Sequence, residues 1–116
     1  MVRIIIERRC QPNREIKLQS LLMELITKVM HQRGYVSGET LRSVDDPSLW
    51  VVISTWLNAD SWRAWEISPE RQELISEIDP LIIAPEKVAI FTFVRQAGAE
   101  SAHTIDRQSE LAAHIS

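Results

Sequence analysis

Apolar residues between positions 14 and 31 recur at intervals of three and four residues. This spacing matches one face of an α-helix, whose period is about 3.6 residues. The apolar positions are Leu18, Leu21, Leu22, Leu25, Ile26, Val29 and Met30. Asn13 precedes the segment as an expected N-cap, and Gly34 follows it as a residue suited to ending a helix. The pattern therefore predicts an amphipathic helix.

Four short segments rich in β-branched and aromatic residues predict strands. They span residues 2–10, 35–44, 49–56 and 87–94. The middle two are joined by the sequence Asp-Asp-Pro-Ser, which favours a turn and makes them a hairpin. A second helical stretch follows the hairpin over residues 59–67. A further helical segment begins after Ser68, a preferred cap, and has a proline at its first position. It runs to about residue 78.

The resulting order, β-α-β-β-α-β, is typical of a ferredoxin-like α+β fold. Right-handed crossovers place the first and fourth strands side by side in a four-stranded antiparallel sheet, with both helical stretches on one face. We expect this domain to span residues 1–95. The composition changes after Arg95, so residues 96–116 are expected to form a C-terminal tail made of a linker and a short helix.

The predicted strands are apolar on both faces. Ile4, Ile5 and Ile6 are consecutive, and residues 49–53 and 88–94 are similarly continuous. A sheet covered on only one face has alternating apolar and polar residues. We therefore expect the second face to be buried against another copy of the chain, as a homodimer formed through the sheet face. The alternative is a few exposed apolar residues, which are common on protein surfaces.

The composition limits the classes of partner and ligand that are expected. The chain has 116 residues and a net charge of −3, so no basic face is indicated and nucleic acid is not an expected partner. No stretch approaches the roughly 18 consecutive apolar residues of a membrane span, and the start does not resemble a signal peptide. A cytoplasmic location is expected. The single cysteine, Cys10, excludes an intrachain disulfide and a thiol pair for a metal, and no metal site is expected.

Three of the four tryptophans lie within residues 56–66. Trp62 and Trp65 are three positions apart and share one face of the predicted helix. That face either forms the wall of a pocket for a flat apolar ligand or belongs to the core. Asn58 lies one helical turn before Trp62. It is either a helix cap or a hydrogen-bonding partner for a substrate oxygen.

Two residues are weak candidates for a catalytic acid or base. Histidine is a common general acid or base, which makes His31 a candidate, but a cation at the end of a helix also complements the helix dipole. Glu7 is either a buried acid or an edge charge on its strand. The neighbouring Arg8 and Arg9 are expected to be solvated at the strand end. His103 and His114 lie in the tail, where no catalytic role is expected.

Several short sequences in order resemble the antibiotic biosynthesis monooxygenase (ABM) family. They are Gly34-Tyr35, the hairpin sequence at 42–47, Trp56, the sequence at 62–66, and Ser68-Pro69 followed by Arg71. The resemblance covers residues 2–95. It implies a dimeric α/β barrel, in which ferredoxin-like subunits dimerise through their sheets, with a pocket between helices and sheet in each subunit.

The activities of this family differ, so the resemblance fixes the scaffold better than the chemistry. Some members oxidise polycyclic phenols or quinols with dioxygen and no cofactor, and others degrade heme. Heme-degrading relatives carry a histidine ligand ten residues after the tryptophan equivalent to Trp65, where this chain has Ile75. They also carry an asparagine on the first strand, which is absent here. Heme degradation is therefore disfavoured, because isoleucine cannot ligate iron.

Two hypotheses follow for the function. The first is a cofactor-independent monooxygenase acting on an aromatic or quinol-like small molecule, with Trp62, Trp65 and Asn58 as substrate-binding residues. The second is a non-catalytic dimeric module that binds a small hydrophobic molecule or a partner protein. The absence of an evident base favours the second hypothesis, because deprotonating a substrate requires a group that accepts the proton.

Overall fold

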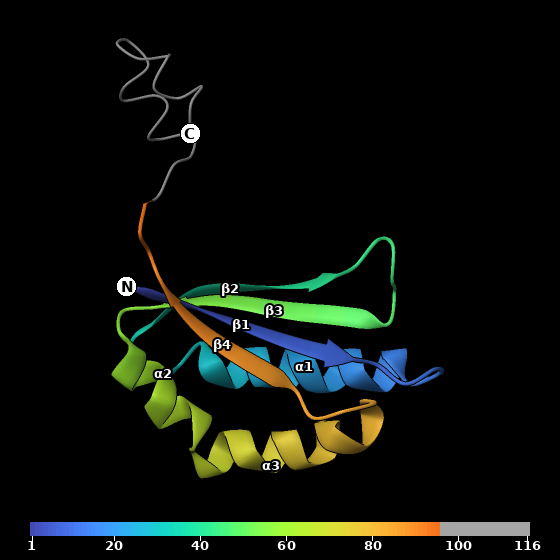
Figure 1. Ribbon diagram of the computed structural model, residues 1–116. Coiled ribbons are helices and arrows are strands. Elements are labelled where there is room, and N and C mark those ends of the chain that lie inside the picture. The colour runs from blue at the N-terminus through green and yellow to red at the C-terminus, as the bar shows by residue number, and fades with distance from the viewer. Residues whose placement is uncertain (96–116) are drawn as a thin grey trace, which may run out of the picture.

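A four-stranded antiparallel sheet and a layer of helices make up the computed structural model, which describes residues 1–95 (Figure 1). The strands are β1 (Val2–Arg9), β2 (Tyr35–Arg42), β3 (Leu49–Trp56) and β4 (Lys87–Thr92). The helices are α1 (Glu15–Val29), α2 (Ala59–Glu66) and α3 (Pro69–Ile78), and a 3-10 turn, η1 (Asp79–Leu81), follows α3. The ferredoxin-like α+β prediction is confirmed. The expected tail at 96–116 lies outside the described residues.

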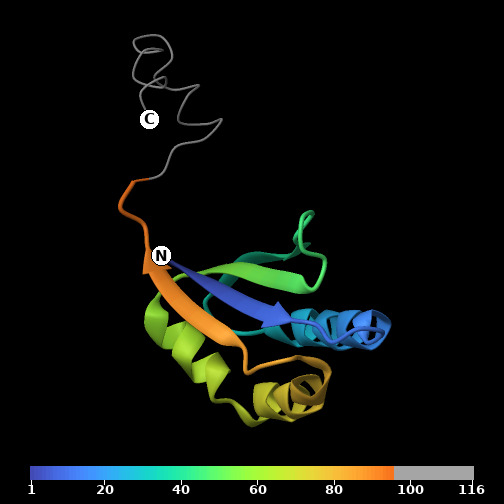
Figure 2. The same ribbon diagram turned by 45° about the vertical axis from the view of Figure 1, so that its right-hand side comes forward.

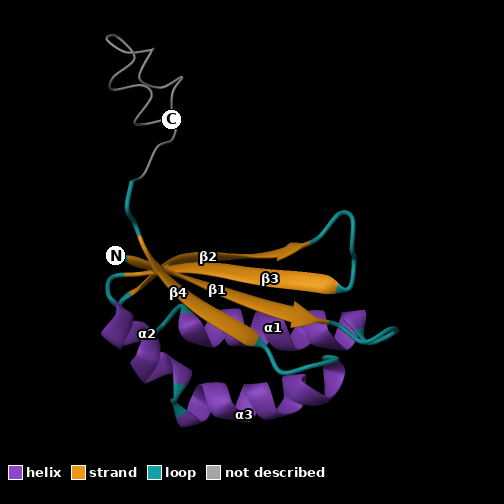
Figure 3. Ribbon diagram, viewed as in Figure 1, coloured by secondary structure: helices purple, strands orange, loops and turns teal. Residues whose placement is uncertain are grey.

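The strand order in the sheet is β2-β3-β1-β4. β1 therefore pairs with both β3 and β4, which confirms the predicted adjacency of the first and fourth strands. All three helices cover the same face of the sheet, as the colouring by element in Figure 3 and the rotated view in Figure 2 both show. None of the helices within residues 1–95 is long and apolar enough to cross a membrane.

The core fills the space between the sheet and the helices. Its fully buried side chains are Ile4, Leu18, Trp56 and Ile78. Along β1 the side chains alternate between the two faces, as the pleat of a strand requires. Ile6 and Arg8 are buried towards the helices, whereas Glu7 and Arg9 are exposed on the other side of the sheet, which we call the open face.

Two of the three N-cap residues expected from the sequence are observed in the structure. The Asn58 side chain accepts a hydrogen bond of 2.8 Å from the backbone N–H of Ser61 at the start of α2, and Ser68 caps α3. The expected cap at Asn13 is wrong, because α1 begins after Arg14 without a side-chain cap. Asn13 instead has φ of 66°, a left-handed conformation that asparagine tolerates in a tight turn.

Strand β2 contains an irregularity that sets which residues face the helices. Tyr35 lies opposite Trp56 and Ser37 lies opposite Thr55, so Val36 is an extra residue in the ladder. In a regular strand Val36 would stand opposite Trp56. The bulge thus places Tyr35 on the helix face, while Glu39, opposite Ile53, lies on the open face.

Gly34, just before β2, brings that strand close to the start of α2. Its φ is +90°, and a Cβ built there would clash with Ser61 Oγ. Only glycine combines this conformation with such a close approach.

The open face carries apolar side chains at its centre. Ile5 on β1 lies between Ile53 on β3 and Ala89 on β4, and Phe91 is 50% exposed beside them. Charged residues, including Arg3 and Glu7, surround these positions on the same face. The pattern agrees with the expectation that the face is apolar, and the homodimer stays a prediction.

Candidate functional site

A narrow cavity of about 50 Å³ lies between α1, the sheet and the residues of α2 and α3 that face it. The α1 side is aliphatic, with Leu22, Leu25 and Ile26 among its residues. A cavity of this size exceeds the ~10–15 Å³ that one water molecule needs. It is much smaller than the roughly 300 Å³ at which sites for drug-sized ligands begin. The cavity as described therefore has room for water but not for a drug-sized ligand.

Aromatic rings form one wall of the cavity. The ring of Trp56 contacts Tyr35 edge-on at 5.4 Å and Trp62 at 5.7 Å, both between centroids, and Trp65 completes the wall. Trp56 Nε1 donates to Ser54 Oγ at 3.1 Å. Trp62 Nε1 is also buried, but it has no hydrogen-bond partner among residues 1–95. The wall thus carries a fully buried donor without a partner among residues 1–95.

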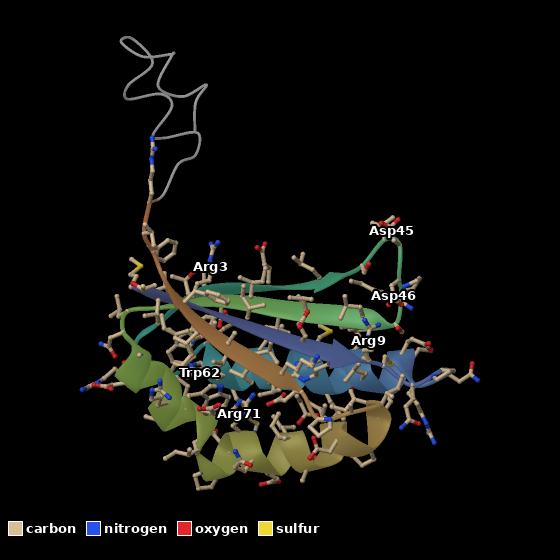
Figure 4. The ribbon with its side chains drawn as sticks, viewed as in Figure 1. Arg3, Arg9, Asp45, Asp46, Trp62 and Arg71 are labelled. Atoms are coloured by element: carbon tan, nitrogen blue, oxygen red, sulfur yellow. The ribbon has the colours of Figure 1, made fainter. Side chains whose placement is uncertain are left out.

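Two buried arginines share one carboxylate beside this wall. Arg8 on β1 donates from Nε and Nη2 to Glu86 Oε1, at 2.9 and 2.7 Å. Arg71 on α3 donates from Nη2 to Glu86 Oε2 at 2.9 Å. The Arg71 guanidinium also lies 5.2 Å from the centroid of the Trp62 ring, and Figure 4 shows the two side chains between the sheet and the helices. Arg8, Glu86 and Arg71, called here the arginine cluster, join β1, α3 and the segment before β4.

The arginine cluster keeps a net positive charge at neutral pH. Burial alone raises the pKa of the Glu86 carboxyl, but Arg8 and Arg71 outweigh it and hold that pKa below its ordinary value of 4.5. Burial also lowers the pKa of Arg8, with Glu86 opposing it. Arginine starts from so high a value that it stays protonated. Two positive groups therefore face one negative group.

Tyr35 is a further titratable group of the cavity wall. Burial raises the pKa of its phenol above the ordinary value of 10. The hydroxyl is therefore neutral at physiological pH and is available as a hydrogen-bonding group. A Cβ at Gly38 would lie 2.7 Å from this hydroxyl, so the glycine leaves the space that the Tyr35 side chain occupies.

The structure brings together two of the five residues singled out from the sequence. Trp62 and Trp65 both line the cavity. Asn58 is exposed and caps α2 outside it. His31 is exposed in the turn after α1, and Glu7 is exposed on the open face. The functional roles assigned to these five residues stay predictions.

The expectation that Arg8 is solvated is wrong, since it is 3% exposed. The alternation that buries Ile4 and Ile6 also buries Arg8, whereas the consecutive Ile4, Ile5 and Ile6 hid this alternation in the sequence. The partner of Arg8 could not be inferred from the strand pattern either, because Glu86 is 78 residues away along the chain. Arg71 is also 3% exposed, and it had entered only as part of the family resemblance.

Residues 1–95 contain no group of three His, Cys, Asp or Glu side chains that could hold a metal ion. Ile75 packs against the core, and His31 is exposed away from the cavity. These residues do not fit heme ligation, which requires an axial donor such as histidine facing the iron. His103 and His114 lie outside the described residues.

A second, wider hollow adjoins the cavity on the side of α1 and β2. This groove has a volume of about 290 Å³ and includes Arg42 and Trp50, whose side chains stack at 5.3 Å. It shares Leu22, Ile26 and Thr40 with the inner cavity. These three residues therefore lie where the cavity and the groove adjoin.

Comparison with known proteins gives both a family and a fold. The model of the family described as antibiotic biosynthesis monooxygenase matches residues 1–76. Protein SchA of Streptomyces halstedii is 25% identical over 69 residues, which are 60% of this chain and 18% of that protein. The chain therefore spans under a fifth of the length of this relative.

Two solved structures show the same fold. SnoaB, a cofactor-independent oxygenase from Streptomyces nogalater, has a TM-score of 0.73 and 19% identity, with 84% of this chain and 97% of that chain covered. Rv0793 from Mycobacterium tuberculosis has a TM-score of 0.75 and 20% identity, with 84% of this chain and 98% of that chain covered. At these identities the likeness concerns the arrangement of helices and strands.

Proposed function

The chain belongs to the antibiotic biosynthesis monooxygenase family, and from this premise we propose that it is a cofactor-independent monooxygenase acting on an aromatic or quinol-like small molecule. The observation that carries the proposal is the cavity between helices and sheet, which combines the ring faces of Trp62 and Trp65 with the polar groups of Tyr35 and Arg71. Such a mixture of aromatic wall and few polar groups is typical of small-molecule sites.

The proposed reaction needs only the substrate and dioxygen. At an activated CH2 between two aryl rings, one oxygen atom becomes a carbonyl oxygen and the other leaves as water with the two hydrogens. The substrate supplies all four electrons. In this scheme Trp62 and Trp65 stack against the rings and exclude bulk water, and Arg71 stabilises the negative charge on the deprotonated substrate.

A polycyclic substrate does not fit the inner cavity as it stands. We propose that the reacting part of the molecule lies in the cavity, while the rest of its rings lie in the groove between α1 and β2. The volume of about 290 Å³ and the apolar side chains of Leu22 and Ile26 support this placement. Binding then requires the residues between the two hollows to move apart.

We also propose a homodimer formed through the open face. The half-buried Ile5 and Ile53 and the exposed Phe91 give that face an apolar centre. Proteins of this family are typically dimeric. Because all helices cover the other face, a second copy on the open face leaves the cavity of each subunit in place.

One observation favours a non-catalytic binding module instead. Among the described residues of the arginine cluster and the cavity wall, the ionisable acids are Glu86, Tyr35 and Glu39, and the side chain of Glu39 belongs to the open face by register. Glu86 has a lowered pKa and is tied to two arginines, and Tyr35 has a raised pKa. Neither of these two is suited to accept a proton near neutral pH. A module of this kind would bind an aromatic ligand in the same cavity without turnover.

Oxygen consumption distinguishes the two candidates. The wild-type protein is screened with quinols and anthrones beside Trp62→Ala, Trp65→Ala and the control Leu81→Ala, a buried residue away from the cavity wall. A monooxygenase loses about tenfold or more in rate in the two tryptophan variants and keeps its rate in the control. Binding without oxygen uptake supports the module, and equal rates in all four proteins exclude the tryptophans as contributors.

A further inference from the structure

The wall of the cavity between helices and sheet carries two buried arginines, and the nearby carboxylates do not fully neutralise their charge. Glu86 is the one carboxylate that hydrogen-bonds the two arginines among residues 1–95. Asp79 acts on Arg8 only through space. Glu39 also borders the cavity, but its side chain belongs to the open face by register. Two buried guanidinium groups therefore share one carboxylate, and the excess positive charge is unfavourable unless an anion compensates it.

The donors at this site also outnumber the acceptors. The hydrogen bonds of the Arg71 guanidinium within residues 1–95 use Nη2 alone, which leaves the N–H groups of Nε and Nη1. Trp62 Nε1, next to Arg71, is a buried donor without a partner. An arginine and an indole have no acceptor atoms to offer each other. The group that complements them is an oxygen with negative charge.

We infer that Arg8, Arg71 and Trp62 form a subsite for an anionic oxygen of an aromatic ligand, either a phenolate or a carboxylate. Arg8 and Arg71 supply the net positive charge, and Arg71 and Trp62 supply free N–H donors. The inference rests on the proposed function in taking the ligand to be a small aromatic molecule. It also accounts for the absence of a base. A substrate whose anion is stabilised in the cavity can lose its proton to solvent, or bind already ionised.

A spectroscopic titration of 4-nitrophenol tests the subsite without any oxidation. The phenolate and the neutral phenol absorb at different wavelengths, so the ionisation of the bound molecule is read directly. The subsite predicts that binding lowers the apparent pKa of 4-nitrophenol by about one unit, which corresponds to about tenfold tighter binding of the anion. Nitrobenzene, the neutral analogue, should bind about tenfold more weakly at pH 8, and 4-nitrobenzoate serves as the carboxylate arm.

Two substitutions change the charge of the cluster in opposite directions. Arg71→Gln makes the net charge of the arginine cluster zero and should abolish the preference for the anion. Glu86→Gln leaves both arginines and should strengthen the preference. Arg71→Lys, which keeps the charge, should retain part of it. Each of the first two breaks the same buried network, so damage to the fold alone would weaken binding in both variants alike.

Several results would overturn the inference. They are equal binding of 4-nitrophenolate and nitrobenzene by the wild-type protein, no binding of either anion at millimolar concentration, or a change of the preference in the same direction in Arg71→Gln and Glu86→Gln. The wild-type comparison needs no variant to fold. Anion preference without oxygen uptake supports the subsite and counts against the monooxygenase. Oxygen uptake without anion preference does the reverse.

Discussion

Arg8 and Arg9 are consecutive residues of β1, and each pairs with a carboxylate in a different environment. The Arg8 side chain is 2% exposed and shares Glu86 with Arg71 on the helix face. The Arg9 side chain is 50% exposed and pairs with Asp46 at the end of the hairpin, as Figure 4 shows. The same kind of arginine–carboxylate pair is therefore found in a buried and in an exposed environment. Water and salt screen the exposed pair, whereas the buried charges depend on one another and on whatever occupies the cavity.

Removing the shared carboxylate should give the largest effect. Glu86→Ala leaves two buried guanidinium groups without their partner, and we expect it to lower the free energy of unfolding by about 3–5 kcal/mol. Urea denaturation measures this loss. Glu86→Gln, which keeps the shape and one acceptor oxygen, should cost less. A loss below about 1 kcal/mol in Glu86→Ala would mean that the cluster is solvated and that the contrast with Arg9 is unfounded.

The open face offers the next test. Ile53→Lys places a charge at the apolar centre of the face on which Arg9 lies, and we expect the proposed dimer to dissociate at least tenfold more readily. Sedimentation equilibrium measures the change. Ile16→Lys on α1 is the matched control, because Ile16 is 87% exposed and lies away from the sheet. A wild-type protein that is monomeric at micromolar concentration would contradict the dimer itself.

The third test distinguishes the two ion pairs by their response to low pH. The pKa of Glu86 is lower in the folded protein than its ordinary value of 4.5, so the ionised carboxylate stabilises the fold. This contribution is complete above pH 4.5 and is lost as the pH falls through the folded-state pKa. Hydrogen bonds from Arg9 and Ser48 lower the pKa of Asp46 in the same direction.

High salt distinguishes the two acids, because it screens the exposed pair. Urea midpoints between pH 6 and pH 3 in 0.5 M salt should still fall for the wild-type protein. They should fall less for Glu86→Gln, and Asp46→Asn should behave as the wild type. An identical acid response of Glu86→Gln and wild type would contradict this assignment.

The smallest effect is expected at the exposed pair. Arg9→Gln removes the partner of Asp46 where both side chains are about half exposed. Surface ion pairs contribute little to stability, and their contribution falls with salt. We expect a small decrease in the thermal midpoint at low salt that disappears at high salt, as followed by circular dichroism. A decrease as large as that of Glu86→Ala would remove the distinction between the two arginines.

The sequence predicts the framework well, because hydrophobic spacing reflects burial directly. The apolar stripe ending at Val29 and the hairpin around Pro47 are examples. Trp62 and Trp65 were also placed on one helix face, and both reach the cavity. The expected cap at Asn13 failed because asparagine suits both caps and left-handed turns, and the sequence pattern does not separate the two uses.

The electrostatic part of the site was harder to predict. Arg8 was expected to be solvated because it is charged, and its burial became apparent only in the folded strand. Glu86 lies just before β4 and meets Arg8 and Arg71 only after the chain has folded. No periodicity in sequence connects residues so far apart. The net charge of a buried site therefore depends on tertiary contacts, whereas its apolar wall follows from local spacing.

The three residues between the inner cavity and the outer groove also have a consequence for the speed of binding. Leu22 and Ile26 belong to α1 and Thr40 to β2, so a ring that enters by the proposed route from the groove requires a helix and an edge strand to separate briefly. Such collective motions take microseconds to milliseconds, far longer than single side-chain rotations. Association would then be limited by the opening of the protein, and a ligand once enclosed would leave equally slowly. Residence time would then report on this site more directly than equilibrium affinity.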